Sequence, residues 1–226
     1  MFSRLGQLAS RALEAYLAQL SARPFAVNAA TGAVIAAAGD AACQAALPLV
    51  TGAAPQPFDW RRTAEMAAVR AAFMGPFLTV YFPWLAARAP GTSARAVASR
   101  LVIDQVVGAP FTTSATFALV ALLQGKPETA LPRIRELLLP SLAVSACYWP
   151  LVHSINFSRV PVRHQPLTTH FAALLWQGFL SYSANVALAG DGKSEGKSEQ
   201  SESGESQAPP ARAAAATTAA AAAAAV

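Results

Sequence analysis

The amino-acid sequence predicts an all-α integral membrane protein: a helical bundle of four to five membrane spans followed by a disordered C-terminal tail. Hydrophobic residues make up 54% of the chain and charged residues only 13%, about half the charged share of ordinary soluble domains. Between residues 25 and 189 the charges gather in short connecting stretches and leave long windows almost free of them. The composition changes abruptly at residue 190. We therefore divide the chain into 1–24, a membrane domain at 25–189 and a tail at 190–226.

Residues 1–24 have the pattern of a basic amphipathic helix. They contain three arginines and one acid, and their leucines fall roughly on one side of a helix. An Arg-rich, acid-poor segment of this kind is typical of a mitochondrial targeting sequence. It is also typical of a resident helix that lies in the membrane interface before the first span. The sequence leaves both interpretations open.

The first predicted span, about 25–50, carries a carboxylate in its middle. Asp40 and Gln44 are four residues apart and share one face of a helix. A carboxylate at this depth is costly unless it faces a partner, a bundle interior or water. Two roles are open for this pair: an interhelical hydrogen-bond or salt-bridge anchor, or part of a pore lining. Small residues on the same span predict close helix packing.

The second predicted span, about 63–87, contains a glycine and a proline in its middle. Gly75-Pro76 is expected to kink the helix, because proline lacks the backbone N–H and clashes with the preceding turn. Arg70 stands one turn earlier. We expect its side chain to snorkel outward or to pair with an acid of another span, Asp40 or Asp104.

Three further apolar segments complete the predicted bundle. The third, about 101–123, begins with Asp104-Gln105 and contains Pro110. The fourth, about 137–157, is long enough to span only if its polar end near Asn156 faces protein, since a span needs about 20 apolar residues. The fifth is about 167–189. This gives four or five crossings, and we expect Asn156 to face the bundle interior near Asp40 or Asp104 and to join the last two segments to the rest.

No stretch of the sequence has the spacing of a known catalytic or metal-binding motif. Glycine-rich nucleotide loops, nucleophile elbows, paired-cysteine sites and HExxH are all missing from the printed sequence. The three histidines are not spaced to share one helix face. We therefore expect no enzyme activity, no metal and no cofactor.

The 37-residue tail is too polar in its first half to build a core. The basic residues do not cluster with aromatics, which argues against nucleic acid as a partner.

Short motifs in these segments occur in the order found in one family of membrane proteins. The matching residues are Gly39, Asp40, Gln44, Asp59, Arg62, Gly75, Pro76, Asp104, Gln105, Pro110, Trp149, Pro150, Asn156, Phe157, Pro161 and Trp176. On this ordered set the chain resembles the Mpv17/PMP22 family over about residues 16–182. His153 is a departure, because the family usually has glutamine at this place.

The resemblance implies a small multi-span protein of an organelle. It implies the mitochondrial inner membrane, with the peroxisomal or a plastid membrane as alternatives. Family members are thought to form or modulate weakly selective channels for small solutes, so we expect a small-solute channel or a modulator of organelle membrane permeability. The alternative is a non-conducting structural or scaffolding protein of the same membrane. The lipid bilayer is the expected partner, and assembly as a homo-oligomer stays open.

Overall fold

The computed structural model describes residues 2–51 and 57–176, and this part of the chain consists of helices and short connections, without a strand. The all-α class predicted from the sequence is confirmed for these residues, and the predicted tail at 190–226 lies outside them. The α-helices are α1 Phe2–Ala22, α2 Pro24–Thr51, α3 Trp60–Val69, α4 Gly75–Arg88, α5 Ala94–Ile103, α6 Ala109–Leu123, α7 Ala130–Ser145 and α8 Trp149–Arg159. Residues 165–176 form a further helical segment. Short 3-10 turns lie at Pro127–Thr129 and Val162–His164, and π-helical turns at Arg70–Met74 and Asp104–Gly108.

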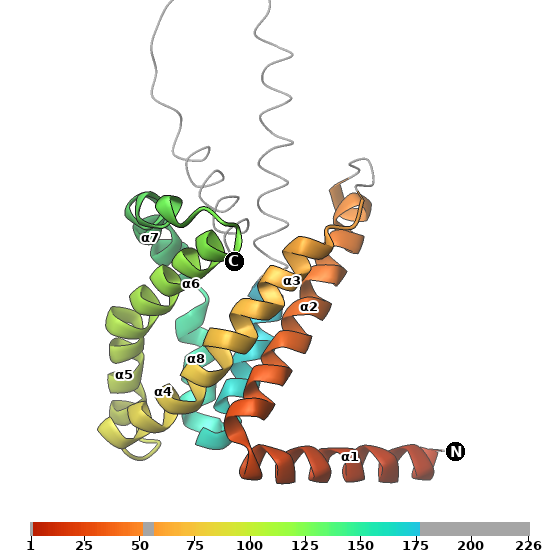
Figure 1. Cartoon of the computed structure of the whole chain (residues 1–226). Coiled ribbons are helices and arrows are strands. Elements are labelled where there is room, and N and C mark those ends of the chain that lie inside the picture. The colour runs from red at the N-terminus through yellow and green to blue at the C-terminus, as the bar shows by residue number, and fades with distance from the viewer. Residues whose placement is uncertain (1, 52–56, 177–226) are drawn as a thin grey trace, which may run out of the picture.

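Helix α1 runs crosswise to α2 at one end of the bundle (Figure 1). Pro24 opens α2, where its missing N–H costs no intrahelical hydrogen bond. Tyr16 of α1 and Thr31 of α2 share a hydrogen bond of 3.3 Å between their hydroxyl oxygens, and Leu20 is buried against the bundle. The predicted N-terminal helix is therefore present, and its role in targeting or at the interface stays a prediction.

Helix α2 packs against α3, the first π turn and α4, and α2 and α3 lie side by side in Figure 1. The backbones of α2 and α4 come close together at Gly75, where an added Cβ would lie 2.6 Å from the Cα of Ala29. Only glycine allows the two backbones to come this near. Asn28 fixes the crossing by donating from Nδ2 to the hydroxyl of Thr79 at 2.8 Å.

Each of the two π turns leads directly into a proline-containing helix start. The backbone N–H of Gly75 bonds to the carbonyl of Arg70, and that of Ala109 bonds to the carbonyl of Asp104. This wider turn lets the helix continue past a proline that cannot donate its own hydrogen bond. Gly75-Pro76 and Pro110 thus mark changes of helical pitch rather than breaks. Each turn has a charged residue at its first position.

By length and composition, two helical runs are able to cross a membrane: Pro24–Ala46 and Ala94–Leu123. The pair Pro127–Ser145 and Trp149–Arg159, bent by 59°, adds a third if it forms one span. The predicted second span is helical, but its charges, glycine and prolines lower its hydropathy, and the predicted fifth span lies partly outside the described residues. Only 28% of each of the two windows is buried, so most of their apolar surface faces outward, where lipid would cover it.

Two apolar clusters hold the helices together. One joins α4, α5 and α8 through Phe82, Leu85, Val97 and Phe157. The other joins α2, α3 and α6 through residues that include Ala36, Met66 and Val120. The first cluster gives the signature residue Phe157 a packing role, since its side chain is almost fully buried.

Candidate functional site

The structure separates the six polar residues predicted inside the spans into three places. Asp40 and Gln44 belong to a network between α2 and α3. Arg70, Asp104 and Gln105 line one cavity in the bundle. Asn156 lies in a third place, where α8 packs on the helical segment 165–176.

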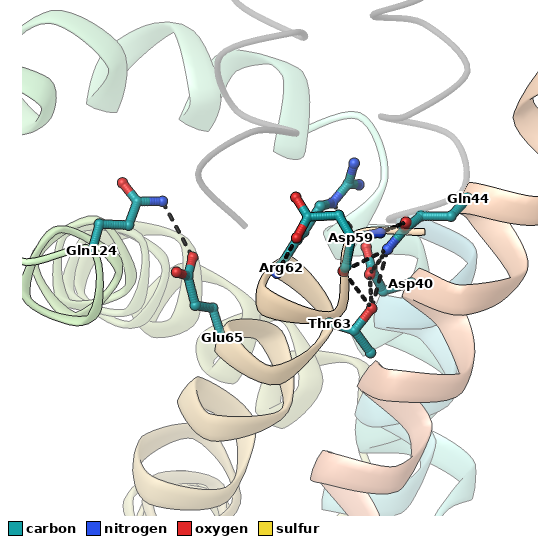
Figure 2. A network of polar contacts seen from close by, with 7 residues as sticks. All are labelled: Asp40, Gln44, Asp59, Arg62, Thr63, Glu65 and Gln124. Carbon is teal, nitrogen blue, oxygen red and sulfur yellow. Dashed lines mark hydrogen bonds and ion pairs between the residues drawn. The ribbon is translucent and has the colours of Figure 1, made fainter. Parts of the chain in front are cut away.

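Asp40 is the centre of the network between α2 and α3, and both of its carboxylate oxygens are engaged (Figure 2). Oδ2 accepts from Gln44 Nε2 at 2.7 Å and from the Thr63 hydroxyl at 2.6 Å. Oδ1 lies 2.9 Å from Arg62 Nε. The carboxylate is 3% exposed, and removing one partner of a buried, paired charge of this kind is strongly destabilising. These contacts between α2 and α3 are the ones that the anchor role requires, and that role stays a prediction.

The same network extends to the start of α3. Gln44 accepts from the backbone N–H of Asp59 at 2.7 Å. Asp59 caps α3, because its Oδ1 accepts from the backbone N–H of Arg62 at 3.0 Å. Farther along α3, Glu65 accepts from Gln124 at the end of α6 (Figure 2). The loop signature Asp59 and Arg62 therefore fixes how α3 begins beside α2.

A separate cavity of about 140 Å³ lies between α3, α4, α6, α7, α8 and residues 165–176. Its walls are mainly apolar and aromatic, with a minority of polar groups. The charged, imidazole, amide and hydroxyl groups that line it are Arg70, Tyr81, Asp104, Gln105, Thr112, Thr113, Thr116, Ser141, Ser145, His153 and Thr169. A mostly apolar cavity with a few converging polar groups is the usual form of a small-molecule site.

Asp104 faces this cavity with neutral or weakly basic neighbours only. Tyr81 donates its hydroxyl to Oδ1 at 3.2 Å. Gln105 donates to Oδ2 at 3.1 Å, and His153 Nε2 lies 3.7 Å from the same oxygen. Within the described residues, no arginine or lysine forms an ion pair with it. His153, where the family usually has glutamine, thus lies beside a buried carboxylate.

Arg70 neither snorkels outward nor pairs with Asp40 or Asp104, and both expectations for this residue were wrong. Its side chain is 8% exposed. Arg62 takes the ion-pair position on Asp40, and Asp104 is engaged by Tyr81 and Gln105. Among the residues that the structure describes, Arg70 forms no ion pair and its side chain makes no hydrogen bond.

Asn156 is fully buried, as expected, but it does not contact Asp40 or Asp104. Its Nδ2 donates to the carbonyl of Gln165 at 3.3 Å and to the Thr169 hydroxyl at 3.2 Å. Gln165 Nε2 returns a bond to the backbone carbonyl of Asn156 at 3.3 Å. This reciprocal pairing closes the turn that contains Pro161. It joins α8 to the next helix, and the expectation that it reaches the first or third span was wrong.

Other signature residues shape the end of the cavity. Trp149 and Trp176 both line it, with ring centroids 6.4 Å apart. Tyr148 stacks on Trp176 at 5.1 Å. Pro150 lies in the first turn of α8, just after the bend that follows α7. The aromatic and proline residues at 148–150 therefore turn the chain and close one wall of the cavity.

Sequence reasoning missed several residues that hold this arrangement. Tyr81 and Thr63 supply hydroxyl donors to the two buried carboxylates. Arg100 binds the carbonyls of Ala89 and Gly91 at 2.9 and 2.8 Å and so fixes the connection between α4 and α5. One feature of the sequence could have pointed to Arg100: it is a basic residue one helical turn before Asp104. No pattern in the sequence singled out Tyr81. Within residues 2–51 and 57–176, no cluster of His, Cys, Asp or Glu is placed to hold a metal ion.

Comparison with known proteins gives a consistent result. The model of the Mpv17 / PMP22 family matches residues 121–181. Protein SYM1 of Gibberella zeae is 30% identical over 169 residues, which is 74% of this chain and 94% of that protein. The mitochondrial inner membrane protein Mpv17 of Drosophila melanogaster is 34% identical over 57% of this chain and 78% of its own length. The Mpv17-like protein of Bos taurus is 32% identical over 56% of this chain and 64% of its own length. No solved structure matches.

Proposed function

Because the chain belongs to the Mpv17 / PMP22 family and is an integral protein of the mitochondrial inner membrane, we propose that it provides a weakly selective path for small solutes through that membrane. The observation that carries the proposal is the cavity between the helices. It brings together Arg70, Asp104 and Gln105, three of the polar residues predicted inside the spans. Polar groups at membrane depth are expensive and usually mark a solute path or its binding site.

The charges of the cavity support weak selectivity. Arg70 stands at the start of one π turn and Asp104 at the start of the other. One positive and one negative group on the same cavity largely cancel, so neither cations nor anions are strongly excluded. The hydroxyl groups of Thr112, Thr113 and Thr116 add sites where water or a polar solute can form hydrogen bonds.

The proposal assigns no catalysis to the chain. The polar groups around the cavity act as donors and acceptors for a passing solute. The relatives named in the comparison are described as membrane proteins or by their family name.

Unitary currents in planar bilayers test the proposal. The purified full-length chain is expected to conduct, and Ser141→Leu is expected to lower the conductance, because Ser141 lines the cavity and leucine would fill part of it. Ser99→Leu is the matched control, since Ser99 is exposed on α5. Silent bilayers from demonstrably folded protein would contradict the channel. Equal conductance in all three proteins would contradict a path through this cavity.

A non-conducting scaffold is the second candidate, and the Asp40 network favours it. Every partner of Asp40 ties α2 to α3 or belongs to α2 itself, which is what a purely structural polar residue does. Under this candidate the exposed apolar faces would serve contacts with lipid and with further copies of the chain. Crosslinked oligomers without solute flux in proteoliposomes would support the scaffold, and flux from a monomeric preparation would contradict it.

A further inference from the structure

The side chain of Arg70 is buried on the wall of the cavity between the helices. Asp104 lines the same cavity but forms no ion pair with it in the part of the chain that the structure describes. The Arg70 side chain is 8% exposed, and none of the described residues forms an ion pair with it. A guanidinium keeps its proton in proteins, so it cannot escape the cost of burial by becoming neutral. An uncompensated buried charge of this kind normally has a partner.

A second buried polar group on the same cavity also lacks a partner. The hydroxyl of Ser141 is enclosed, lines the cavity and makes no hydrogen bond. Unsatisfied buried polar groups are rare in native proteins, and each one requires an explanation. His153 Nδ1 on the same cavity is likewise buried without a hydrogen-bond partner among the described residues. The Arg70 guanidinium and the Ser141 hydroxyl are hydrogen-bond donors, and together they point to a missing ligand that accepts hydrogen bonds.

We propose that the cavity is a binding site for a small carboxylate solute, whose anionic group pairs with Arg70. The planar guanidinium presents parallel N–H donors that match the two oxygens of a carboxylate. This inference names the class of solute that the proposed path would hold. Transport of the carboxylate rests on the proposed path, whereas binding of the carboxylate to the cavity does not.

The size of the cavity limits the solute. Its volume of about 140 Å³ is close to that of an engineered cavity of about 150 Å³ that binds benzene. An acetate-sized anion fits in this space together with a bridging water. The apolar part of the wall, which includes Phe77 and Leu78, would contact the methyl group.

Asp104 opposes the binding of anions, so a variant that removes its charge tests independently whether acetate binds in this cavity. Its carboxylate lines the same cavity and is engaged by uncharged donors, so its negative charge repels a bound acetate. Asp104→Asn is expected to tighten acetate binding several-fold. Binding that is unchanged or weaker in this variant would place acetate outside the cavity and overturn the assignment.

The direct test measures acetate binding to the purified full-length chain in detergent by tryptophan fluorescence, because Trp149 and Trp176 both line the cavity. Sodium acetate is titrated at constant ionic strength, with uncharged acetamide as the matched ligand. We expect a saturable change with acetate and none with acetamide. Arg70→Met should weaken binding by about tenfold or more, whereas Arg95→Met, at an exposed site on α5, should bind as the parent does.

Folding of the loss variant is checked without ligand. Methionine removes a buried unpaired charge, so the thermal midpoint of Arg70→Met should equal or exceed that of the parent, and Arg70→Gln serves as a second loss variant. A parent that does not respond to acetate, or an equal response in the folded Arg70 variants, would overturn the site. Acetate binding by a protein that is silent in bilayers would retain the site and remove the channel. Conduction without acetate binding would retain the channel and overturn the acetate site.

Discussion

The guanidinium of Arg62 lies 2.9 Å from the carboxylate of Asp40 and joins the start of α3 to the second half of α2. Asp40 is 3% exposed, whereas the Arg62 side chain is 40% exposed. The pair therefore sits at the edge of the bundle, with the acid inside and the base reaching toward it from the rim. This geometry separates Asp40 from the central cavity, whose lining does not include it.

Loss of Arg62 should destabilise the bundle, because it leaves a buried carboxylate without its counter-charge. We expect Arg62→Gln to lower the free energy of unfolding by about 1–3 kcal/mol, measured by thermal or denaturant unfolding in detergent. Arg61→Gln is the control: its side chain is 70% exposed and pairs with Glu65 on the same helix, a kind of pair worth about 0.5 kcal/mol or less. Equal losses in the two variants would contradict the anchor.

Addition of a single methyl group at Gly75 should force α2 and α4 apart. The new Cβ would meet the backbone of Ala29 at 2.6–2.7 Å, and backbone atoms cannot move aside as a flexible side chain can. Overpacking of this kind costs about 1–3 kcal/mol. Gly75→Ala is expected to lower the thermal midpoint, while Ala72→Ser, at an exposed site in the neighbouring π turn, should leave it nearly unchanged. A Gly75→Ala protein as stable as the parent would refute the close contact.

The amide of Asn156 should matter for the end of the bundle. Asn156→Ala removes the donor to Gln165 and Thr169 and leaves a void at a fully buried site. We expect a loss of about 2–4 kcal/mol and faster proteolysis after α8. The neighbouring residue Ile155 is exposed, so Ile155→Ala provides the comparison. Similar protease resistance in both variants would show that the amide does not hold the two helices together.

The sequence predicted the helical class and the buried polar positions, because apolar runs and isolated charges within them are local signals. It placed Asp40, Asp104 and Asn156 inside the bundle, and all three are buried. It did not predict their partners. Asp40 pairs with Arg62, only about one turn into the next helix, and Asn156 pairs across the turn at Pro161. Which buried groups meet depends on helix rotation, which hydropathy does not encode.

The π turns show a second limit. Gly75-Pro76 predicted a kink, but a proline such as Pro76 or Pro110 can be accommodated by a break, a bend or a wider turn. The chain adopts the wider π turn at both prolines. A π turn rotates the residues that precede it relative to the residues that follow. That rotation is consistent with the inward position of Arg70, where a regular pattern predicted a snorkelling or paired arginine.

We propose that solutes pass the cavity of Arg70 and Asp104, and that the Asp40 network is structural. The most direct test is the reversal potential in planar bilayers under a salt gradient, compared for Asp104→Asn and Asp40→Asn. We predict that Asp104→Asn shifts the preference toward anions, because it removes the negative group of the cavity. Asp40→Asn should lower the thermal midpoint and leave the reversal potential unchanged. A shift with Asp40→Asn and none with Asp104→Asn would contradict the account.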